Sequence, residues 1–387
     1  MTRLVHFVGS LPAPLTTDDS AVLEWFVQRS RGHRLTGVPR DLDPSWVVQY
    51  LRERERHDDV FEVVRGGDFA DYADMRVYGI RRGATLEPRH VAMDRVDRIG
   101  AAVTAFRALR ARHPELAGTR LQISQPNPLD LALFVFGGAA VADGLPLVRA
   151  LRHLRTVAPA LRNLPVFVEA VLDEMARVTA EHGEVITWQV ESPIAQLALV
   201  KAARFGAQAP VGRLVAGQLA GFLARAHDIG AQTVLHLCYG DYQHKELLAP
   251  RSLAPAVRLL NTVARDLRAR AVPLPPAHIP CAYGAHPAPL EPAFYRPLRK
   301  LDPDWRVIAG VVSPAGTQDS IRSLALFEAA AGRAAYGVAT ACGLGRCTVE
   351  EAERAAEATV TTAAAAEPAP SDAARAPVEP SGDGSTA

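Results

Sequence analysis

The sequence has few cysteines and almost no net charge: four cysteines and a formal charge of +1. It also lacks any apolar run that approaches the roughly 20 residues of a membrane helix. The near-neutral charge gives no electrostatic case for binding nucleic acid or an anionic membrane. The amino-terminal residues lack the long apolar core of a signal peptide. We therefore expect a cytoplasmic protein with no nucleic-acid or membrane partner.

The composition is that of an ordinary globular protein, with 48% hydrophobic and 22% charged residues. Apolar strand-like segments alternate with helical ones, which is typical of a parallel sheet covered by helices. We predict strands at residues 4–8, 120–124, 184–190, 233–238, 274–279, 307–312 and 336–341, and helices at 94–113, 164–182, 211–230, 254–270, 320–331 and 348–359. A count close to eight strands favours an α/β fold closed as a (β/α)8 TIM barrel.

The end of the chain differs in composition from the rest. Residues 361–387 are rich in Ala, Pro, Glu, Ser and Gly and have almost no large apolar side chain. Such a segment buries too little surface to offset the entropy lost on ordering. We therefore predict one TIM-barrel catalytic domain over residues 1–360 and a disordered tail over 361–387.

His236 and Cys238 close an apolar run, Thr233-Val234-Leu235. Side chains two residues apart on a strand point to the same side, so these two lie together. Imidazole and thiolate are suitable zinc ligands. Active residues of a barrel gather at the carboxyl ends of its strands, and Cys342 follows a later strand. We predict a Zn²⁺ site assembled by the fold, with Cys342 as a third ligand.

The fourth ligand has two candidates. His278 ends a strand between those of Cys238 and Cys342, and its alternative role is that of an ordinary packed histidine. Cys281 is the rival ligand. Cys347, near the start of a helix, is expected to be structural. His244 lies in the loop after Cys238, and we expect at most substrate or indirect contacts from it.

Zinc with an open coordination position binds a substrate thiol and keeps it ionised. A water-activating protease site would normally use a helical His-Glu-x-x-His motif, which is absent. Glu191 ends a strand and is suited to bind an ammonium group beside the thiol; capping the next helix is its alternative role. Gly9, Ser10 and Gln189 also follow or end strands, and with Glu191 they form the candidate substrate-binding set.

Four motifs resemble, in order, those of the catalytic C-terminal domain of cobalamin-independent methionine synthase, a family related to uroporphyrinogen decarboxylase. The similarity spans residues 4–360 and is greatest to short stand-alone members. It implies a (β/α)8 barrel with zinc at His236, Cys238 and Cys342. It also implies alkylation of a thiol such as homocysteine, with Glu191 at its amino group and Gly9 and Ser10 at its carboxylate. The motifs are Val8-Gly9-Ser10-Leu11-Pro12, Gln189-Val190-Glu191-Ser192-Pro193, His236-Leu237-Cys238-Tyr239-Gly240 and Ala341-Cys342-Gly343-Leu344.

The sequence departs from this family at three points. The family's remaining zinc ligand is a Glu, and the nearest equivalent here is His278, which implies a set of two His and two Cys. The family has a proton-transferring His before a Ser-Pro pair, where this chain has Val312, so that role is unassigned. The chain length leaves no room for the family's duplicated amino-terminal half, which argues against a methyltetrahydrofolate donor.

The leading hypothesis is a zinc-dependent thiol alkyltransferase, resembling a methyltransferase, that acts on a small-molecule thiol and an alkyl donor. One alternative is a metal-independent decarboxylase or lyase of the uroporphyrinogen decarboxylase type, which would need arginines such as Arg40, Arg81 and Arg82 in the pocket. That alternative leaves Cys238 and Cys342 without a role. A second alternative is a non-catalytic protein that binds zinc or thiols.

Overall fold

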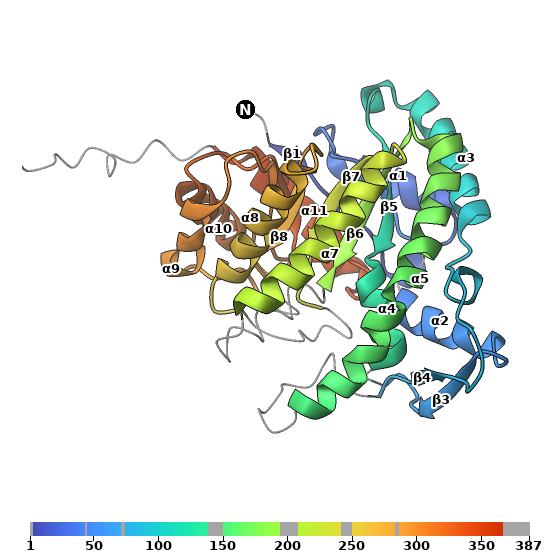
Figure 1. The fold of residues 1–387 in the computed structure, drawn as a ribbon. Helices are drawn as coiled ribbons and strands as arrows, with labels where there is room; N and C mark the ends of the chain where they lie inside the picture. Colours follow the sequence, from blue (N-terminus) through green and yellow to red (C-terminus); the bar gives the residue numbers. More distant parts are fainter. Residues whose placement is uncertain are drawn as a thin grey trace, which may run out of the picture.

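A sheet of eight parallel strands surrounded by helices forms the centre of the molecule (Figure 1). The structure is a computed structural model that describes residues 3–42, 45–70, 74–137, 150–193, 208–240, 250–282 and 286–366. The strands are β1 (Leu4–Val5), β2 (Val38–Arg40), β5 (Leu121–Pro126), β6 (Ile186–Ser192), β7 (Thr233–Leu237), β8 (Ala277–Pro280), β9 (Val307–Val312) and β10 (Gly337–Thr340).

The strands lie in the order β1-β10-β9-β8-β7-β6-β5-β2, and every neighbouring pair is parallel. A parallel bridge between Val5 and Leu35 joins the two ends of this sheet. Val5 N donates to Arg34 O at 2.9 Å, and Thr36 N donates to Val5 O at 3.0 Å. The prediction of an α/β TIM-barrel-like fold is confirmed.

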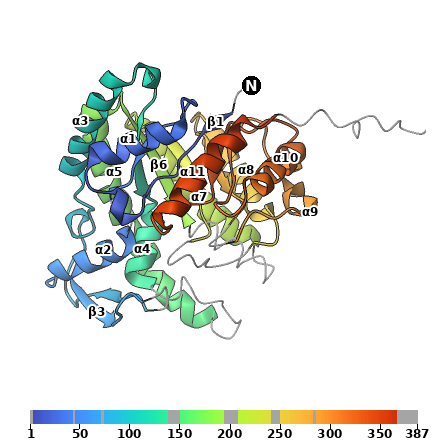
Figure 2. The same cartoon turned by 180° about the vertical axis from the view of Figure 1, so that it is seen from behind.

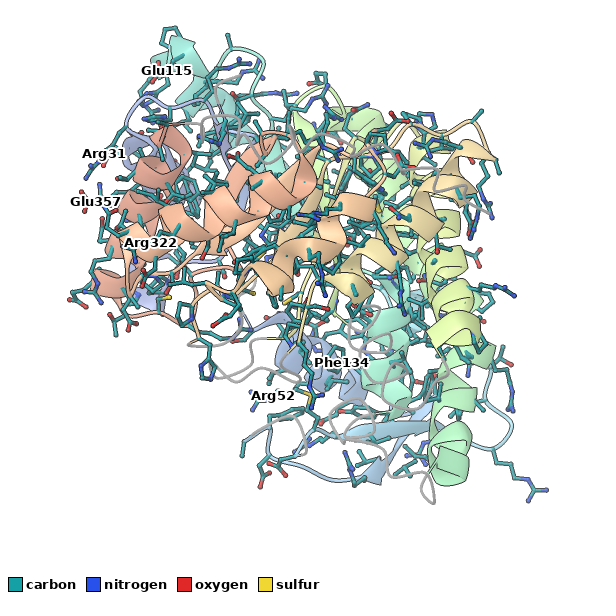
Figure 3. All side chains as sticks on the ribbon, turned by 90° about the vertical axis from the view of Figure 1, so that its left-hand side faces the viewer. Arg31, Arg52, Glu115, Phe134, Arg322 and Glu357 are labelled. Atoms are coloured by element: carbon teal, nitrogen blue, oxygen red, sulfur yellow. The ribbon has the colours of Figure 1, made fainter. Side chains whose placement is uncertain are left out.

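Helices cover the outside of the sheet (Figures 1 and 2). They are α1 (Asp19–Ser30), α2 (Trp46–Glu53), α3 (Val96–Arg112), α4 (Pro128–Gly137), α5 (Ala150–His182), α7 (Gln208–Asp228), α8 (Ala254–Arg268), α9 (Pro292–Tyr295), α10 (Thr317–Ala331) and α11 (Val349–Ala364). The first and last helices, α1 and α11, lie side by side (Figure 2). An exposed ion pair between Arg31 and Glu357, at 3.0 Å, joins them on the face seen in Figure 3.

The segment between β2 and α3 contains elements that the sequence did not predict. It forms α2 and an antiparallel hairpin of β3 (Phe61–Arg65) and β4 (Val77–Ile80), which lies outside the barrel (Figure 1). Phe61 anchors the hairpin, because its ring lies 6.0 Å from Tyr78 and 6.5 Å from Phe136 of α4. Phe136 in turn lies 6.0 Å from Phe167 of α5. This aromatic contact fixes the hairpin to the helical layer.

Two elements differ from the sequence prediction because of proline. Strand β2 contains Pro39, which cannot donate to a strand ladder and argues against a strand. Helix α5 begins at Ala150, well before the predicted start at Leu164, and contains Pro159 and Pro165. Proline favours the first turn of a helix, so the later start was the natural prediction.

The last helix ends later than the sequence predicted, beyond residue 360. Helix α11 continues through residues 361–364, which had been assigned to the tail. Arg3 donates to Glu328 through Nε and Nη2, both at 2.6 Å, and through Nη1 to Ala365 O at 2.6 Å and Ala363 O at 3.4 Å. These bonds satisfy carbonyl groups at the end of the helix, which otherwise lack partners. The remainder of the predicted tail, residues 367–387, lies outside the described residues.

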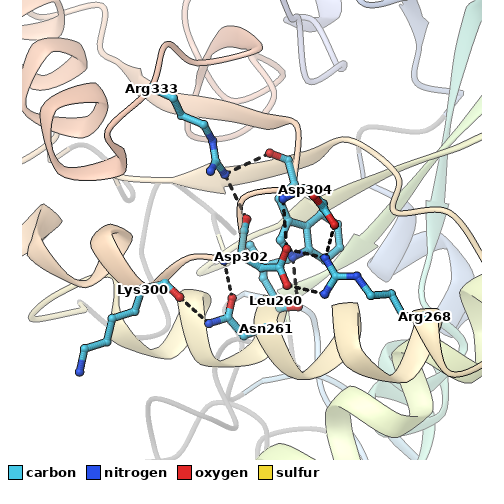
Figure 4. Close-up of polar contacts among 8 residues, drawn as sticks. Leu260, Asn261, Arg268, Lys300, Asp302, Asp304 and Arg333 are labelled. Atoms are coloured by element: carbon cyan, nitrogen blue, oxygen red, sulfur yellow. Dashed lines mark hydrogen bonds and ion pairs between the residues drawn. The ribbon is translucent and has the colours of Figure 1, made fainter.

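Figure 4 shows how α8 is fixed to the chain that enters β9. Asn261 Nδ2 donates to Lys300 O at 2.7 Å, and Asp302 N donates to Asn261 Oδ1 at 2.9 Å. Arg268 binds both carboxylate oxygens of Asp302 at 2.5 and 2.6 Å. Arg333 Nη2 donates to Asp302 O at 3.1 Å. These bonds fix the start of β9, whose far end reaches the candidate site.

In the described part of the chain, no helix is both long enough and apolar enough to cross a membrane.

Candidate metal centre

The structure brings together three of the four predicted metal ligands. Ligand atoms of His236, Cys238 and Cys342 all lie within 4.8 Å of one another. His236 is on β7, Cys238 directly follows it, and Cys342 lies two residues beyond β10. The two Sγ atoms are 3.9 Å apart. One imidazole and two sulfurs converging in this way form a donor set that suits zinc.

The surroundings of His236 favour its metal-binding form. Burial lowers the pKa of His236 well below its usual value, and the neighbouring His278 and His6 add to the effect. The imidazole is therefore neutral, which is the form that binds a metal. Gly240 N lies 3.3 Å from Cys238 Sγ and donates to it, which helps to fix the position of the sulfur.

His278 and Cys281 do not belong to the cluster. His278 is fully buried, and its Nε2 donates to Thr340 O at 2.9 Å. Cys281 is also fully buried, and its Sγ contacts Ile279 O at 3.7 Å. Burial raises the pKa of the Cys281 thiol, so it stays protonated. Among the described residues, the ligand set that the structure brings together therefore has three members.

Ser10 holds the loop that carries Cys342. Gly345 N donates to Ser10 Oγ at 3.1 Å, and Leu344 N donates to Ser10 O at 3.0 Å. A Cβ added at Gly343 would lie 2.3 Å from Ser10 Oγ, so this approach requires glycine. Gly9 has a φ of +144°, a conformation open to glycine. Gly9 and Ser10 were predicted to bind substrate; both line a cavity beside the cluster, and Ser10 also fixes a ligand loop.

Glu191 lies near the end of β6 (Ile186–Ser192) and lines the cavity beside the cluster. Its pKa is raised to about 7, chiefly by burial and then by the nearby carboxylate of Asp41. Hydrogen bonds from Gln189 and Ser124, together with the charge of Arg346, act in the opposite direction. A carboxyl group with a pKa raised by a like charge in a cavity is a recurring feature of binding and catalytic sites.

Gln189 supports Glu191 and does not line either cavity described below. It is fully buried, and its Nε2 donates to Val8 O at 2.7 Å and to Glu191 Oε1 at 3.0 Å. Its Oε1 accepts from Gln122 Nε2 at 2.9 Å. The amide therefore orients the carboxylate, whereas the sequence suggested that it contacts substrate directly.

Two cavities share the cluster as a common wall. The smaller, of about 80 Å³, is lined by Glu191, Asp41 and Ser10 together with the three ligands, and by Trp46 and Phe134, whose rings meet edge to face. The larger, of about 510 Å³, contains Cys238 and Cys342 but not His236. The residues common to both are Cys238, Gly240, Cys342, Gly343 and Arg346.

The larger cavity is formed by the ends of β8, β9 and β10 and the start of α11. Among the described residues that line it, the ionisable ones apart from cysteines are Tyr239, His286, Arg346, Glu351 and Arg354. Val312 and Ser313 also line it, so β9 presents no base at the position where the sequence left proton transfer unassigned. Cys347 faces the same cavity, so it lies closer to the centre than its predicted structural role suggested.

The arginines of the lyase hypothesis lie away from both cavities. Arg40 is paired with Asp19 at 2.7 Å. Arg81 and Arg82 are exposed after β4, and Arg81 Nε donates to Asp58 O at 2.5 Å. His244, predicted to be a loop residue near the site, lies outside the described residues.

Sequence reasoning missed Asp41 and Arg346 as members of the site. Asp41 follows β2, so it occupies the same kind of strand-end position as Glu191, but the unrecognised strand hid that signal. Arg346 belongs to the same run as Cys342, and its position on the wall of both cavities depends on how that loop folds.

Comparison with solved structures finds similar folds. A B12-independent methionine synthase from Shewanella sp. W3-18-1, solved in complex with selenomethionine, has a TM-score of 0.51 and 11% identity, over 94% of this chain and 97% of that one. A methyltransferase from Methanosarcina mazei has a TM-score of 0.50 and 12% identity, over 94% and 93%. At these identities the similarity shows the fold. No protein-family model and no curated protein matches the sequence.

Proposed function

We propose that this protein is a zinc-dependent thiol alkyltransferase. The observation that carries the proposal is the convergence of His236, Cys238 and Cys342 within 4.8 Å, with the two cysteines on a wall shared by two cavities. These three residues would hold the metal and leave a coordination position for an incoming sulfur. Bound zinc supplies Lewis acidity that keeps a coordinated thiol ionised at neutral pH. The fold similarity to a methionine synthase and a methyltransferase supports this class of reaction.

The smaller cavity suits a thiol that also carries an amino group. Glu191 and Asp41 place two carboxyl groups there, and an ammonium between them relieves their mutual repulsion. Gln189 holds Glu191 by a 3.0 Å hydrogen bond, so the acceptor is oriented before substrate arrives. Homocysteine has the required thiol and ammonium groups, and its carboxylate has Arg346 as a cationic neighbour on the same wall.

The larger cavity is the proposed site of the alkyl donor. It is lined by Cys238 and Cys342 but not by Glu191 or Asp41, and its volume of about 510 Å³ is in the range of small-molecule sites. In the reaction, the thiolate sulfur forms a bond to the alkyl carbon as the bond from that carbon to the donor breaks. The electron pair of the broken bond leaves with the donor, and a proton is needed there if the leaving group is basic.

Zinc K-edge spectroscopy tests the proposal. The purified chain should bind one zinc, with one nitrogen and two sulfur ligands from the protein. Addition of homocysteine should bring a further sulfur into the coordination sphere, and thioether should form when a competent methyl donor is present. Zinc without sulfur entry would leave the chain as a non-catalytic zinc-binding protein. Failure to bind zinc would remove the basis of the proposal.

A further inference from the structure

We propose that His278 is a positioning residue that braces the two chain segments supplying the metal ligands, and that it is not itself a ligand. This inference rests on the metal centre proposed above. It gives a role to a buried histidine that the proposed reaction leaves unused.

One contact of His278 is with the ligand on β7. His278 and His236 are register partners on the neighbouring strands β8 and β7. Their rings stack with centroids 4.6 Å apart and an angle of 19° between their planes. A stacked ring of this kind restricts the rotation of the His236 imidazole and so fixes the direction of its ligand nitrogen. Neighbours that orient a metal-bound histidine commonly set metal affinity.

The second contact leads to the ligand after β10. His278 Nε2 donates to Thr340 O at 2.9 Å, and the Thr340 hydroxyl donates to Cys342 O at 2.7 Å. Because β9 lies between β8 and β10 in the sheet, the imidazole crosses a whole strand to make this bond. His278 thus touches one ligand directly and the other through a single residue.

Gly310 of β9 makes this crossing possible. A Cβ at Gly310 would lie 2.5 Å from His278 Nε2, 2.9 Å from its Cε1 and 2.9 Å from Ile279 O, closer than real Cβ atoms approach. The glycine gives the ring its path across β9. The closest of these contacts supplies a second variant, because Gly310→Ala should displace the ring, along with adjacent β8 backbone, without replacing any ligand or the histidine.

The third neighbour of His278 fills the remaining side of the ring. His6 lies after β1 with its ring centroid 5.8 Å from that of His278, and its Nδ1 is 2.7 Å from Thr36 Oγ1. All three histidine rings are buried, and the ring of His278 contacts both of the others. Displacement of the His278 ring would therefore remove a packing contact of His236.

The test measures metal affinity and coordination in the full chain with Zn²⁺ and, for absorption spectra, Co²⁺. Four proteins are compared with the wild type: His278→Ala, Gly310→Ala, the double variant, and Gly221→Ala. The last is the control, since an added Cβ at Gly221 in α7 meets nothing within 4 Å. A chelator competition gives the affinity, and zinc K-edge spectra give the ligand set.

We expect His278→Ala and Gly310→Ala each to weaken metal binding about 10- to 100-fold, as removal of groups that orient ligands does elsewhere. The ligand set should remain one nitrogen and two sulfurs, with the sulfur-to-cobalt bands retained. The double variant should bind metal about as tightly as the weaker-binding single variant, because both substitutions remove the same contact between His278 and its neighbours. Gly221→Ala should bind as the wild type does.

Four outcomes would overturn the inference. Loss of a nitrogen ligand in His278→Ala would make His278 a ligand. Unchanged metal affinity in both single variants would leave His278 only a packing role. If the losses of affinity in the two single variants multiply in the double variant, His278 and Gly310 act independently. A wild-type chain that binds no metal would overturn this inference and the proposed function together. If His278→Ala does not fold, His278→Gln serves instead, because its amide donates to Thr340 O but cannot stack; a partial loss with an unchanged ligand set is then expected.

Discussion

Cys238 Sγ and Cys342 Sγ lie 3.9 Å apart although 104 residues separate them in the chain. Two thiolates at that distance repel each other strongly unless a cation lies between them. We therefore expect Cys238→Ser and Cys342→Ser each to abolish tight zinc binding, measured as metal content after gel filtration. Cys281→Ser is the matched control, because that thiol is buried outside the cluster and should leave the zinc content unchanged. Stoichiometric zinc in either cluster variant would remove that residue from the ligand set.

The carboxyl group of Glu191 should discriminate between thiols. Glu191→Gln keeps the shape but removes the charge, and we expect amino-thiol binding to weaken about 10- to 100-fold, as loss of a charge-assisted hydrogen bond does. The variant should still bind one zinc ion per chain. The comparison is between homocysteine and a thiol of similar length without an amine, titrated by calorimetry into both proteins. Equal losses for the two thiols would contradict an ammonium-binding role, and an unfolded variant would point to helix capping.

Binding of an amino-thiol should depend on pH through Glu191. Its pKa in the free protein is raised to about 7, and the ionised form is the one that binds ammonium. Affinity should therefore be constant above pH 7, where Glu191 is ionised. Below pH 7 it should fall about tenfold for each pH unit. The ratio of homocysteine affinity to that of the amine-free thiol isolates this effect from ionisation of the sulfur. In Glu191→Gln the ratio should lose this pH dependence; a ratio that is flat in the wild type would exclude Glu191.

Two ion pairs in the same region should differ greatly in their effect on stability. Arg3 and Glu328 have side chains that are each 3% exposed, so Arg3→Ala leaves a buried, unpaired carboxylate. We expect it to lower the free energy of unfolding by about 3–5 kcal/mol. Arg31→Ala breaks a pair whose side chains are 56% and 57% exposed, and it should cost about 1 kcal/mol or less. Urea denaturation followed by circular dichroism makes the comparison; similar losses would mean that Arg3 does not fix α11.

Much of the fold could be predicted because its strands are short apolar runs separated by amphipathic helices. The strand predicted at Val307–Val312 has the same bounds in the structure, and that at Thr233–Cys238 differs by one residue. Strand β2 could not be recognised, because Val-Pro-Arg carries too little apolar signal and contains proline. The β3–β4 hairpin depends on a ring contact of Phe61 with Phe136 of α4, which itself packs on α5, and local sequence does not encode these contacts.

The site likewise has features that the sequence could predict and features that it could not. The convergence of His236, Cys238 and Cys342 follows from strand periodicity and from the rule that strand ends meet at one face of a barrel. His278 satisfies the same rule and pairs in register with His236, but its Nε2 is bonded to Thr340 O and its ring stacks on that of His236. The direction in which a strand-end side chain turns depends on packing against the neighbouring strands, here the close approach of the ring to Gly310, and local sequence does not encode that contact.

The shared wall between the two cavities has a consequence for the order of events. A molecule in the smaller cavity and another in the larger one would each contact the same sulfur pair, and apart from five shared residues the two cavities have different linings, so each molecule has space of its own. A reaction between them would proceed through a complex that holds both at once. Its steady-state rates should give intersecting reciprocal plots, in contrast to the parallel lines of an enzyme that is modified by one partner and discharged by the next.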